Sequence, residues 1–119
     1  MALIALGLGG CKEAPAPLDI DNRLTADEIA AARLTPEVMW KMGRIGSAVL
    51  SPDGGTLLYT LTRYNMAENR GVTTIVAQNM ADGSSLPLTD TSSNATAPVW
   101  NNDGNEIWFL SNRSGSMQI

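Results

Sequence analysis

The sequence predicts a mainly β chain in which short α-helices precede the strands. From residue 47 onward, short runs rich in Val, Ile, Leu, Thr and Tyr are separated by turn residues, as in antiparallel strands. One of these turns recurs at a fixed interval, and two helix-start signals stand before residue 47. Together these patterns place the helices first and a repeated set of antiparallel strands after them.

The composition excludes several classes of function. With 119 residues, the chain has room for one domain at most. It has no histidine and one cysteine, so it cannot complete a Ser-His-Asp or Cys-His site, and a zinc enzyme would lack ligands. A net charge of −4, from 12 acidic and 8 basic residues, argues against a nucleic-acid partner. We therefore expect no catalytic residue, no cofactor and no metal site within the chain.

The first eleven residues are typical of an export signal. Residues 1–10 (MALIALGLGG) are uncharged and much shorter than the roughly 20 residues that a membrane-spanning helix needs. The run Leu8-Gly9-Gly10-Cys11 resembles a bacterial lipobox, in which the cysteine is diacylated and becomes the mature amino terminus. Residues 1–11 are thus predicted to be a lipoprotein signal with Cys11 as the lipidated residue. The alternative is a buried free cysteine that follows an apolar core segment.

The residues around Cys11 bear on that choice. No Lys or Arg precedes the apolar run, although signals normally open with a positive region, and a start codon further upstream would explain this. Residues 12–24 begin with the Pro/Ala-rich segment KEAPAP, which is typical of a tether. Lys12 is not the Asp that is associated with inner-membrane retention. By this resemblance, the protein would be anchored to the periplasmic side of the outer membrane.

Two helix-start signals define a lead-in segment at residues 25–46. Thr25 and Glu28 form a capping box, and Thr35 followed by Pro36 and Glu37 begins a second helix. Val38, Met39 and Met42 share an apolar face with Trp40 near its edge, and Gly43 is the expected stop. Such a Met/Trp stripe could bind a ligand, but it more often docks a helix on a neighbouring domain.

Two turns mark the start of a repeated unit. Ser51-Pro52-Asp53-Gly54 and Asn101-Asn102-Asp103-Gly104 stand 50 residues apart, each between strand-like runs. Further positions match at the same offset: Val49 with Val99, Leu57 with Ile107, Tyr59 with Phe109 and Arg63 with Arg113.

A repeat of this length built from antiparallel strands is typical of a β-propeller, with one blade per repeat. Residues 47–94 would form the first blade, with strands near 47–50, 56–62, 72–79 and 85–89. Residues 95–119 would begin the second, with strands near 96–100 and 105–111. The sequence thus predicts an incomplete β-propeller of about one and a half blades. Because a closed propeller needs roughly 4–8 blades, we expect this chain to be the amino-terminal part of a longer protein.

Two segments carry a resemblance to a known family. Leu34 to Met42 (LTPEVMWKM), followed by Leu50 to Gly54 (LSPDG), resembles the opening of bacterial prolyl oligopeptidase family serine peptidases. That family includes dipeptidyl peptidases and acylaminoacyl peptidases. Residues 97–113, with Pro98, Trp100 and Arg113, resemble a blade pattern that TolB-like propellers share. Asn101-Asn102 replaces the usual Ser-Pro but keeps a turn-forming pair.

The resemblance implies a two-domain serine peptidase. Its propeller would control access of peptides to an α/β-hydrolase domain, where a Gly-x-Ser-x-Gly turn presents the nucleophile and His and Asp complete the triad. This chain contains neither that motif nor a histidine, so whether it is itself an enzyme is left open. Two alternatives remain, namely a TolB-like binding protein of the cell envelope and a propeller fused to another hydrolase, such as an amidohydrolase.

Within the chain, a few polar residues are candidates for functional sites. Asp53 and Asp103 could act as paired carboxylates, although their place before Gly favours turn caps. Arg63 and Arg113 could bind an anion or, more simply, a turn or a neighbouring blade. Residues 102–106 offer oxygen ligands without the alternating spacing of a calcium loop. The sequons at Asn94 and Asn112 carry little weight in a bacterial export context.

Overall fold

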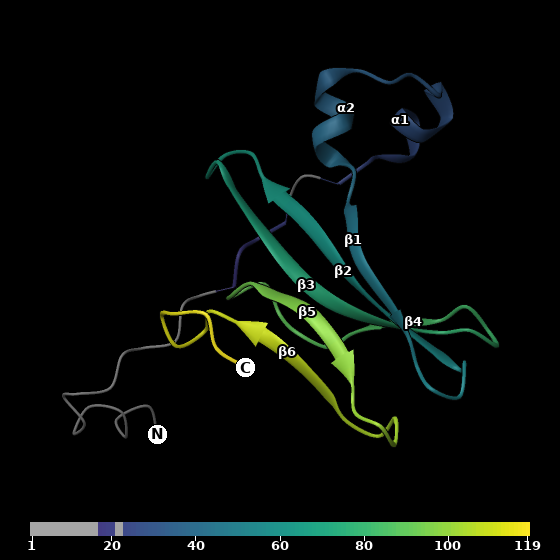
Figure 1. Cartoon of the computed structure of the whole chain (residues 1–119). Coiled ribbons are helices and arrows are strands. Elements are labelled where there is room, and N and C mark those ends of the chain that lie inside the picture. The colour runs from purple at the N-terminus through teal and green to yellow at the C-terminus, as the bar shows by residue number, and fades with distance from the viewer. Residues whose placement is uncertain (1–16, 21–22) are drawn as a thin grey trace, which may run out of the picture.

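The computed structural model of the chain describes residues 17–20 and 23–119 (Figure 1). Cys11 and the rest of the predicted signal lie outside these residues. The elements follow one another as α1 (Ala26–Ala31), α2 (Pro36–Lys41), β1 (Arg44–Leu50), β2 (Thr56–Asn65), β3 (Arg70–Asn79), β4 (Ser85–Pro87), β5 (Ala95–Trp100) and β6 (Ile107–Ser111).

Both predicted helix starts are confirmed. Thr25 caps α1 through a complete capping box with Glu28, and the Thr35 hydroxyl accepts a hydrogen bond from the Val38 N–H at 3.2 Å. The end of α2 differs from the prediction, because the cap is Met42 in an extended conformation and not Gly43. The chain passes directly into β1 at Arg44, which pairs with Thr62 of β2. Backbone pairing therefore extends this strand three residues earlier than the side-chain pattern indicates.

The first sheet is a simple antiparallel meander in the order β1-β2-β3-β4. Its longest pairing joins β2 and β3 without interruption from Thr56↔Asn79 to Asn65↔Arg70. The register of β1 against β2 shifts between Ile45 and Ala48, as in a β-bulge. With β1 at one edge and the three-residue β4 at the other, both edges of the sheet lack a further strand among the described residues.

The second sheet, β5-β6, repeats the β1-β2 hairpin 50 residues later. Ile45↔Leu61 corresponds to Ala95↔Ser111, and the register shifts within one residue of the same place in the repeat, between Ile45 and Ala48 and between Thr96 and Val99. The turns agree as well: Gly54 N–H donates to Ser51 O at 2.9 Å, and Gly104 N–H donates to Asn101 O at 3.1 Å. The repeated sequence therefore corresponds to a repeated hairpin structure.

The two sheets pack face to face around a small apolar core. Leu58 and Ile75 of the first sheet are fully buried against Ala95 of β5. The side chains that pack around these three are Ala77, Trp100, Ile107 and Phe109. Trp100 also joins the sheets, because its Nε1–H donates to Val49 O at 3.4 Å. Burying a side chain such as Leu58 contributes about 1.5–3 kcal/mol to folding.

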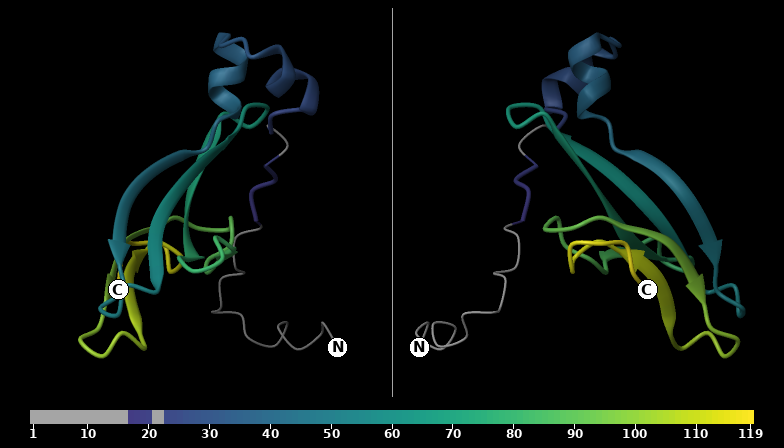
Figure 2. Two further views of the ribbon diagram at one scale, coloured as in Figure 1. Left: turned by 90° about the vertical axis from the view of Figure 1, so that its right-hand side faces the viewer. Right: turned by 60° about the vertical axis from the view of Figure 1, so that its left-hand side comes forward.

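The other face of the first sheet is crossed by residues 17–20 (Figure 2). Leu18 is buried, and two hydrogen bonds join it to Thr91. The Leu18 N–H donates to Thr91 O at 2.9 Å, and the Thr91 hydroxyl donates to Leu18 O at 2.8 Å. The Asn65 amide donates to Asp19 O at 2.7 Å. These bonds attach residues 17–20 to the end of β2 and to the loop that follows β4.

The predicted fold class is confirmed: the chain is mainly β, with antiparallel sheets of four and two strands preceded by short helices. The helices lie at one end of the first sheet, and the β1–β2 and β5–β6 turns lie at the other (Figures 1 and 2). Within the described residues, no helix is long and apolar enough to cross a membrane.

Candidate functional site

Asp53 is a turn residue in the structure and not half of a catalytic pair. Its carboxylate accepts hydrogen bonds from the Ser51 hydroxyl at 2.6 Å and from the Gly55 N–H at 2.9 Å. These bonds, the one from Ser51 foremost, hold the pKa of Asp53 below its ordinary value. A carboxylate held this way is a poor proton acceptor, since its charged form is already satisfied.

Asp82 and Asp90 follow the same pattern in other turns. Each carboxylate accepts from the hydroxyl and the backbone N–H of the serine two residues on, Ser84 and Ser92 respectively. These hydrogen bonds lower the pKa of both aspartates, and the bond from the serine hydroxyl contributes more than the bond from the backbone N–H. The carboxylates therefore act as Asx-type turn caps.

Asp103 does not play the part of Asp53 in the second turn. Its side chain makes no hydrogen bond with the described residues, and Asn101 takes over the capping. The Asn101 side-chain oxygen accepts from the N–H groups of Asn105 and Glu106, at 3.1 and 3.3 Å. In the first repeat the equivalent N–H groups, of Gly55 and Thr56, donate to Asp53 and Ser51, so one oxygen of Asn101 does the work of two side chains.

A calcium site at residues 102–106 finds no support. In the part of the chain that the structure describes, no three acidic or cysteine side chains come together as potential metal ligands. The oxygen atoms of Asn101 and Asn105 are engaged in the turn itself, because the Asn101 amide donates to the Asn105 side chain at 2.7 Å.

Arg63 and Arg113 occupy matching positions in the repeat but different environments. The Arg113 guanidinium lies 5.5 Å from the Phe109 ring centroid, and its Nε donates to Ser111 Oγ at 3.2 Å. Arg63 forms no ion pair with any residue that the structure describes, and it lies on the outer face of the first sheet. Arg113 is exposed and binds its own turn, whereas Arg63 is half-buried on the face of the sheet.

A groove of about 480 Å³ runs along that outer face, beside residues 20 and 23. Its floor includes Tyr59 and Leu61, with Arg23 and Arg63 at one end. The same two arginines line an adjoining hollow of about 460 Å³ next to Lys41. A groove with an apolar floor and two cations is large enough to hold part of another protein segment.

The sequon residue Asn94 has a structural part between the sheets. Its side-chain oxygen accepts from the Thr73 N–H at 2.9 Å, and its own N–H donates to the Asn112 side chain at 2.8 Å. Asn94 therefore links β3 to the end of β6, and Asn112 completes that link.

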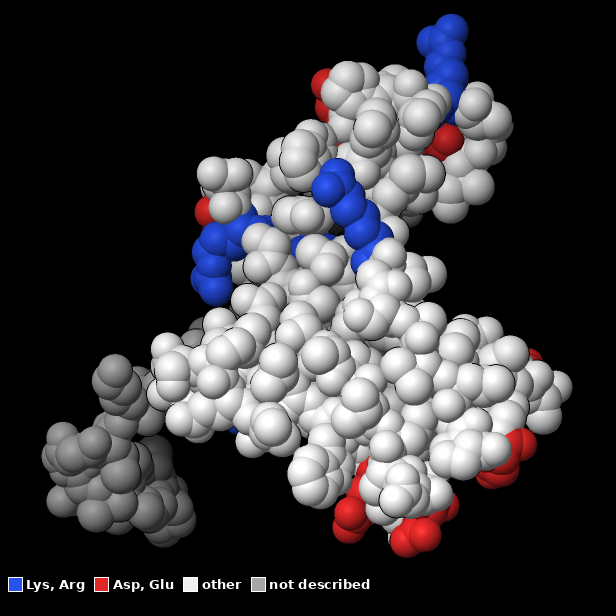
Figure 3. Space-filling model, viewed as in Figure 1, with Lys and Arg blue, Asp and Glu red and all other residues white. Residues whose placement is uncertain are grey.

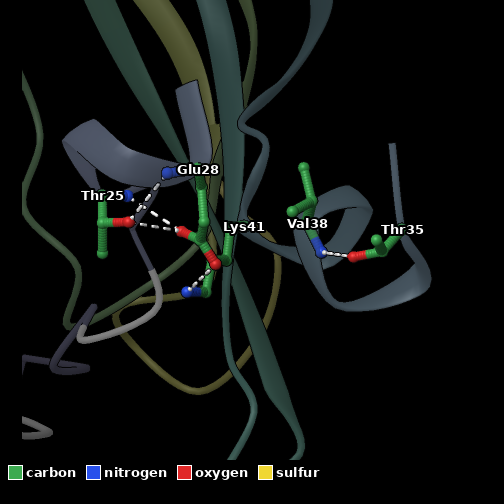
Figure 4. Close-up of polar contacts among 5 residues, drawn as sticks. All are labelled: Thr25, Glu28, Thr35, Val38 and Lys41. Carbon is green, nitrogen blue, oxygen red and sulfur yellow. Dashed lines mark hydrogen bonds and ion pairs between the residues drawn. The ribbon is translucent and has the colours of Figure 1, made fainter. Parts of the chain in front are cut away.

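An ion pair joins the two lead-in helices (Figure 4). Glu28 accepts from the Lys41 ammonium group at 2.7 Å and, on its other oxygen, from the Thr25 N–H at 2.9 Å. The bond to Lys41, followed by that to Thr25, lowers the pKa of Glu28. One carboxylate thus serves both the capping box of α1 and the packing of α2 beside it.

A cluster of aromatic rings around Arg44 lies where α2 meets the first sheet. The ring centroids of Trp40 and Tyr64 are 5.3 Å apart in an edge-on arrangement, and the Arg44 guanidinium lies close to both. The docking role predicted for Trp40 agrees with this contact. The sequence gives no local signal for Arg44 or Tyr64, because the cluster depends on how β1 and β2 pair.

The chain resembles two curated peptidases. It is 37% identical over 86 residues to dipeptidyl-peptidase 5 of Porphyromonas gingivalis, a match that covers 72% of this chain and 13% of that protein. It is 30% identical over 99 residues to dipeptidyl-peptidase 5 of Porphyromonas endodontalis, covering 83% of this chain and 14% of that protein. No protein-family model and no solved structure matches. The chain is therefore related to dipeptidyl peptidases over most of its length and corresponds to about one seventh of theirs.

Proposed function

We propose that the chain is the amino-terminal, non-catalytic segment of an exported serine peptidase that cleaves peptides. The likeness to two dipeptidyl peptidases, over 72% and 83% of the chain, carries this proposal. Peptides are then the substrates of the whole protein, and the lead-in helices and sheets are part of its scaffold.

The scaffold that we propose is a β-propeller. Two hairpins with the same register, the same shift in pairing and the same turn follow each other at an offset of 50 residues, which supports a repeated blade. In addition, β5 packs across β1, β2 and β3, so the second hairpin is stacked on the face of the first sheet, as successive blades are in a propeller. In this arrangement β1–β4 form the first blade and β5–β6 begin the second.

The catalytic groups of this proposal come from outside the chain. No histidine is present to act as general base, and the aspartates of the β-hairpin turns are either engaged in the turn or exposed. An α/β-hydrolase domain would supply the serine nucleophile, the histidine and its orienting aspartate. The propeller would admit peptides to that domain and exclude folded proteins.

The activity is tested on the intact product of the gene. We expect it to release dipeptides from unblocked peptide substrates, to lose this activity on treatment with a fluorophosphonate, and to carry the label on one serine outside residues 1–119. A purified product that binds envelope proteins but hydrolyses no peptide would contradict the peptidase and favour the TolB-like alternative. Hydrolysis that resists the fluorophosphonate and needs a metal would favour the amidohydrolase alternative.

We also propose that Cys11 anchors the protein by a lipid to the periplasmic side of the outer membrane. The lipobox-like residues 8–11 and the Pro/Ala-rich segment after them support this. Cells grown with radioactive palmitate should label the wild-type protein, and Cys11→Ser should abolish the label. Ser47→Cys in the Cys11→Ser background is the matched control, since it restores a thiol elsewhere. Label in that control, or its persistence in Cys11→Ser, would contradict the anchor.

A further inference from the structure

Arg44 lies at the start of β1 and packs against two aromatic rings that also contact each other. Its guanidinium carbon is 5.0 Å from the centroid of the Trp40 ring and 5.1 Å from that of the Tyr64 ring. Cation–π contacts of this kind hold a guanidinium in place through the ring faces and leave its N–H groups available. Within residues 17–20 and 23–119, no acidic side chain contacts the head group of Arg44.

The described residues use little of the hydrogen-bonding capacity of Arg44. A guanidinium has five N–H donors, and the single hydrogen bond from Arg44 to a described residue is a long one, from Nη1 to the Tyr64 hydroxyl at 3.5 Å. The acidic residues with basic partners nearby are Glu28, which binds Lys41 at 2.7 Å, and Glu68, which binds Arg70 at 3.4 Å. Among the described residues, therefore, no carboxylate neutralises Arg44.

Basic and acidic residues are unevenly distributed over the molecule. Most of the basic side chains that Figure 3 shows lie over the upper half of the surface, whereas acidic atoms gather at the lower tips, where the hairpin turns are, and a few also lie at the upper end. The acidic residues of those turns are Asp53, Asp82, Asp103 and Glu106. Arg63, which forms no ion pair with a described residue, lies on the opposite face of the sheet, because it follows Thr62, the β2 partner of Arg44.

The strand that follows Arg44 points to the form of the ligand. β1 is an edge strand, so its outer backbone groups have no strand partner among the described residues near Arg44. Ile45 is 68% exposed and offers an apolar side chain beside the cation. Towards the other end of β1, Trp100 already covers the Val49 carbonyl, and the register shift after Ile45 interrupts the edge. The open part of the edge therefore suits only a short extended peptide.

We propose that Arg44, packed against the Trp40–Tyr64 ring pair, binds a carboxylate of a short extended peptide lying against the first residues of β1. A planar guanidinium takes a carboxylate through two parallel N–H···O bonds, a geometry that lysine does not reproduce. The carboxylate belongs either to the carboxyl terminus of the peptide or to an Asp or Glu side chain. The inference concerns binding and does not require the peptidase chemistry.

Fluorescence anisotropy on the intact gene product tests this proposal. The probes are three short peptides with fluorescein on the amino terminus: one with a free carboxyl terminus and no acidic residue, its carboxamide, and the carboxamide with one Glu. We expect at least one carboxylate-bearing probe to bind about tenfold or more tightly than the neutral carboxamide, as charge-assisted hydrogen bonds predict. Preference for the first or the third probe identifies the source of the carboxylate.

Three variants distinguish binding by Arg44 from a non-specific effect of positive charge. Arg44→Gln should abolish the preference, Arg44→Lys should retain only part of it, and Arg33→Gln, which removes an exposed arginine with no ring contact, should leave it unchanged. Circular dichroism checks that each variant is folded, and dipeptide release measured in parallel reports separately on the proposed peptidase. Equal binding of all three probes, or a preference that survives in Arg44→Gln or is undiminished in Arg44→Lys, would overturn the site.

Discussion

Glu28 shows how one side chain can connect two helices that are each too short to be stable alone. Its carboxylate receives the Thr25 N–H within α1 and the Lys41 ammonium group from α2. A six-residue helix has little intrinsic stability in water, so such caps and cross-links decide whether it forms. The order of α1 should therefore depend on the charge of Glu28.

The pH dependence of α1 follows from the sign of the Glu28 shift. Because the folded state lowers the pKa of Glu28 below its ordinary value of 4.5, the stabilisation is present above that value and is lost as the pH falls through the folded value. An NMR titration of the Glu28 carboxyl carbon should show this low pKa, together with loss of the α1 amide protection. Lys41→Gln should raise the titration midpoint. An unchanged midpoint in that variant would show that the ion pair is not formed.

Gly46 is required by the close approach of β1 to β2. A Cβ at this position would be 2.6 Å from Thr60 Oγ1, and Thr60 is buried. We expect Gly46→Ala to destabilise the sheet by about 1–3 kcal/mol, as overpacking does, and to speed amide hydrogen exchange in β2. In a Thr60→Ala background the nearest Thr60 atom is the Cβ at 3.9 Å, so the same change should cost much less. Equal costs in both backgrounds would refute the clash.

At the scale of elements, Asn94 is the polar link between the two sheets. It gives the Thr73 N–H an acceptor that no strand provides there, since β4 pairs with β3 only at residues 76–78. Asn94→Ala should leave this N–H unpaired at a cost of about 1–3 kcal/mol, which exchange rates at Thr73 would report. Asn94→Asp keeps a side-chain acceptor and should retain most of the protection. Slow exchange at Thr73 in Asn94→Ala would contradict the link.

The elements that the sequence predicts well are those with local causes. Caps at Thr25 and Thr35 and the turns at Gly54 and Gly104 depend on residues within a few positions of each other, so their patterns are visible in the sequence. The repeat at an offset of 50 residues also predicts the matching hairpins.

Features that depend on pairing across the sheet cannot be predicted from local sequence patterns. Trp40 and Tyr64 meet only because α2 runs into β1, whose partner is β2, and Leu18 finds Thr91 across the sheet. The exchange of capping roles in the second turn is another such case. Asn101 can replace the Ser51–Asp53 pair because its side-chain oxygen accepts from two N–H groups, whereas the sequence pattern alone favours Asp103 as the cap.

At the scale of the whole molecule, the proposed propeller predicts that a neighbouring blade covers the outer face of the first sheet. The groove there is lined by Tyr59, Leu61 and Thr74. In a Cys11→Ser background, Thr74→Cys should react slowly with a maleimide in the intact gene product, because a closing blade would cover it. Ser84→Cys, on the exposed β3–β4 turn, should react fast. Equal rates at both positions would mean that the groove stays open.

The central claim is that the two sheets are successive blades of a peptidase propeller, and a crystal or cryo-EM structure of the intact gene product tests it most directly. We predict that β1–β4 and β5–β6 belong to adjacent blades of one closed ring, with β1 and β5 nearest its axis and a Ser-His-Asp hydrolase domain beside it. A structure in which the two sheets close on each other as a free-standing sandwich, with no further blades, would contradict the account.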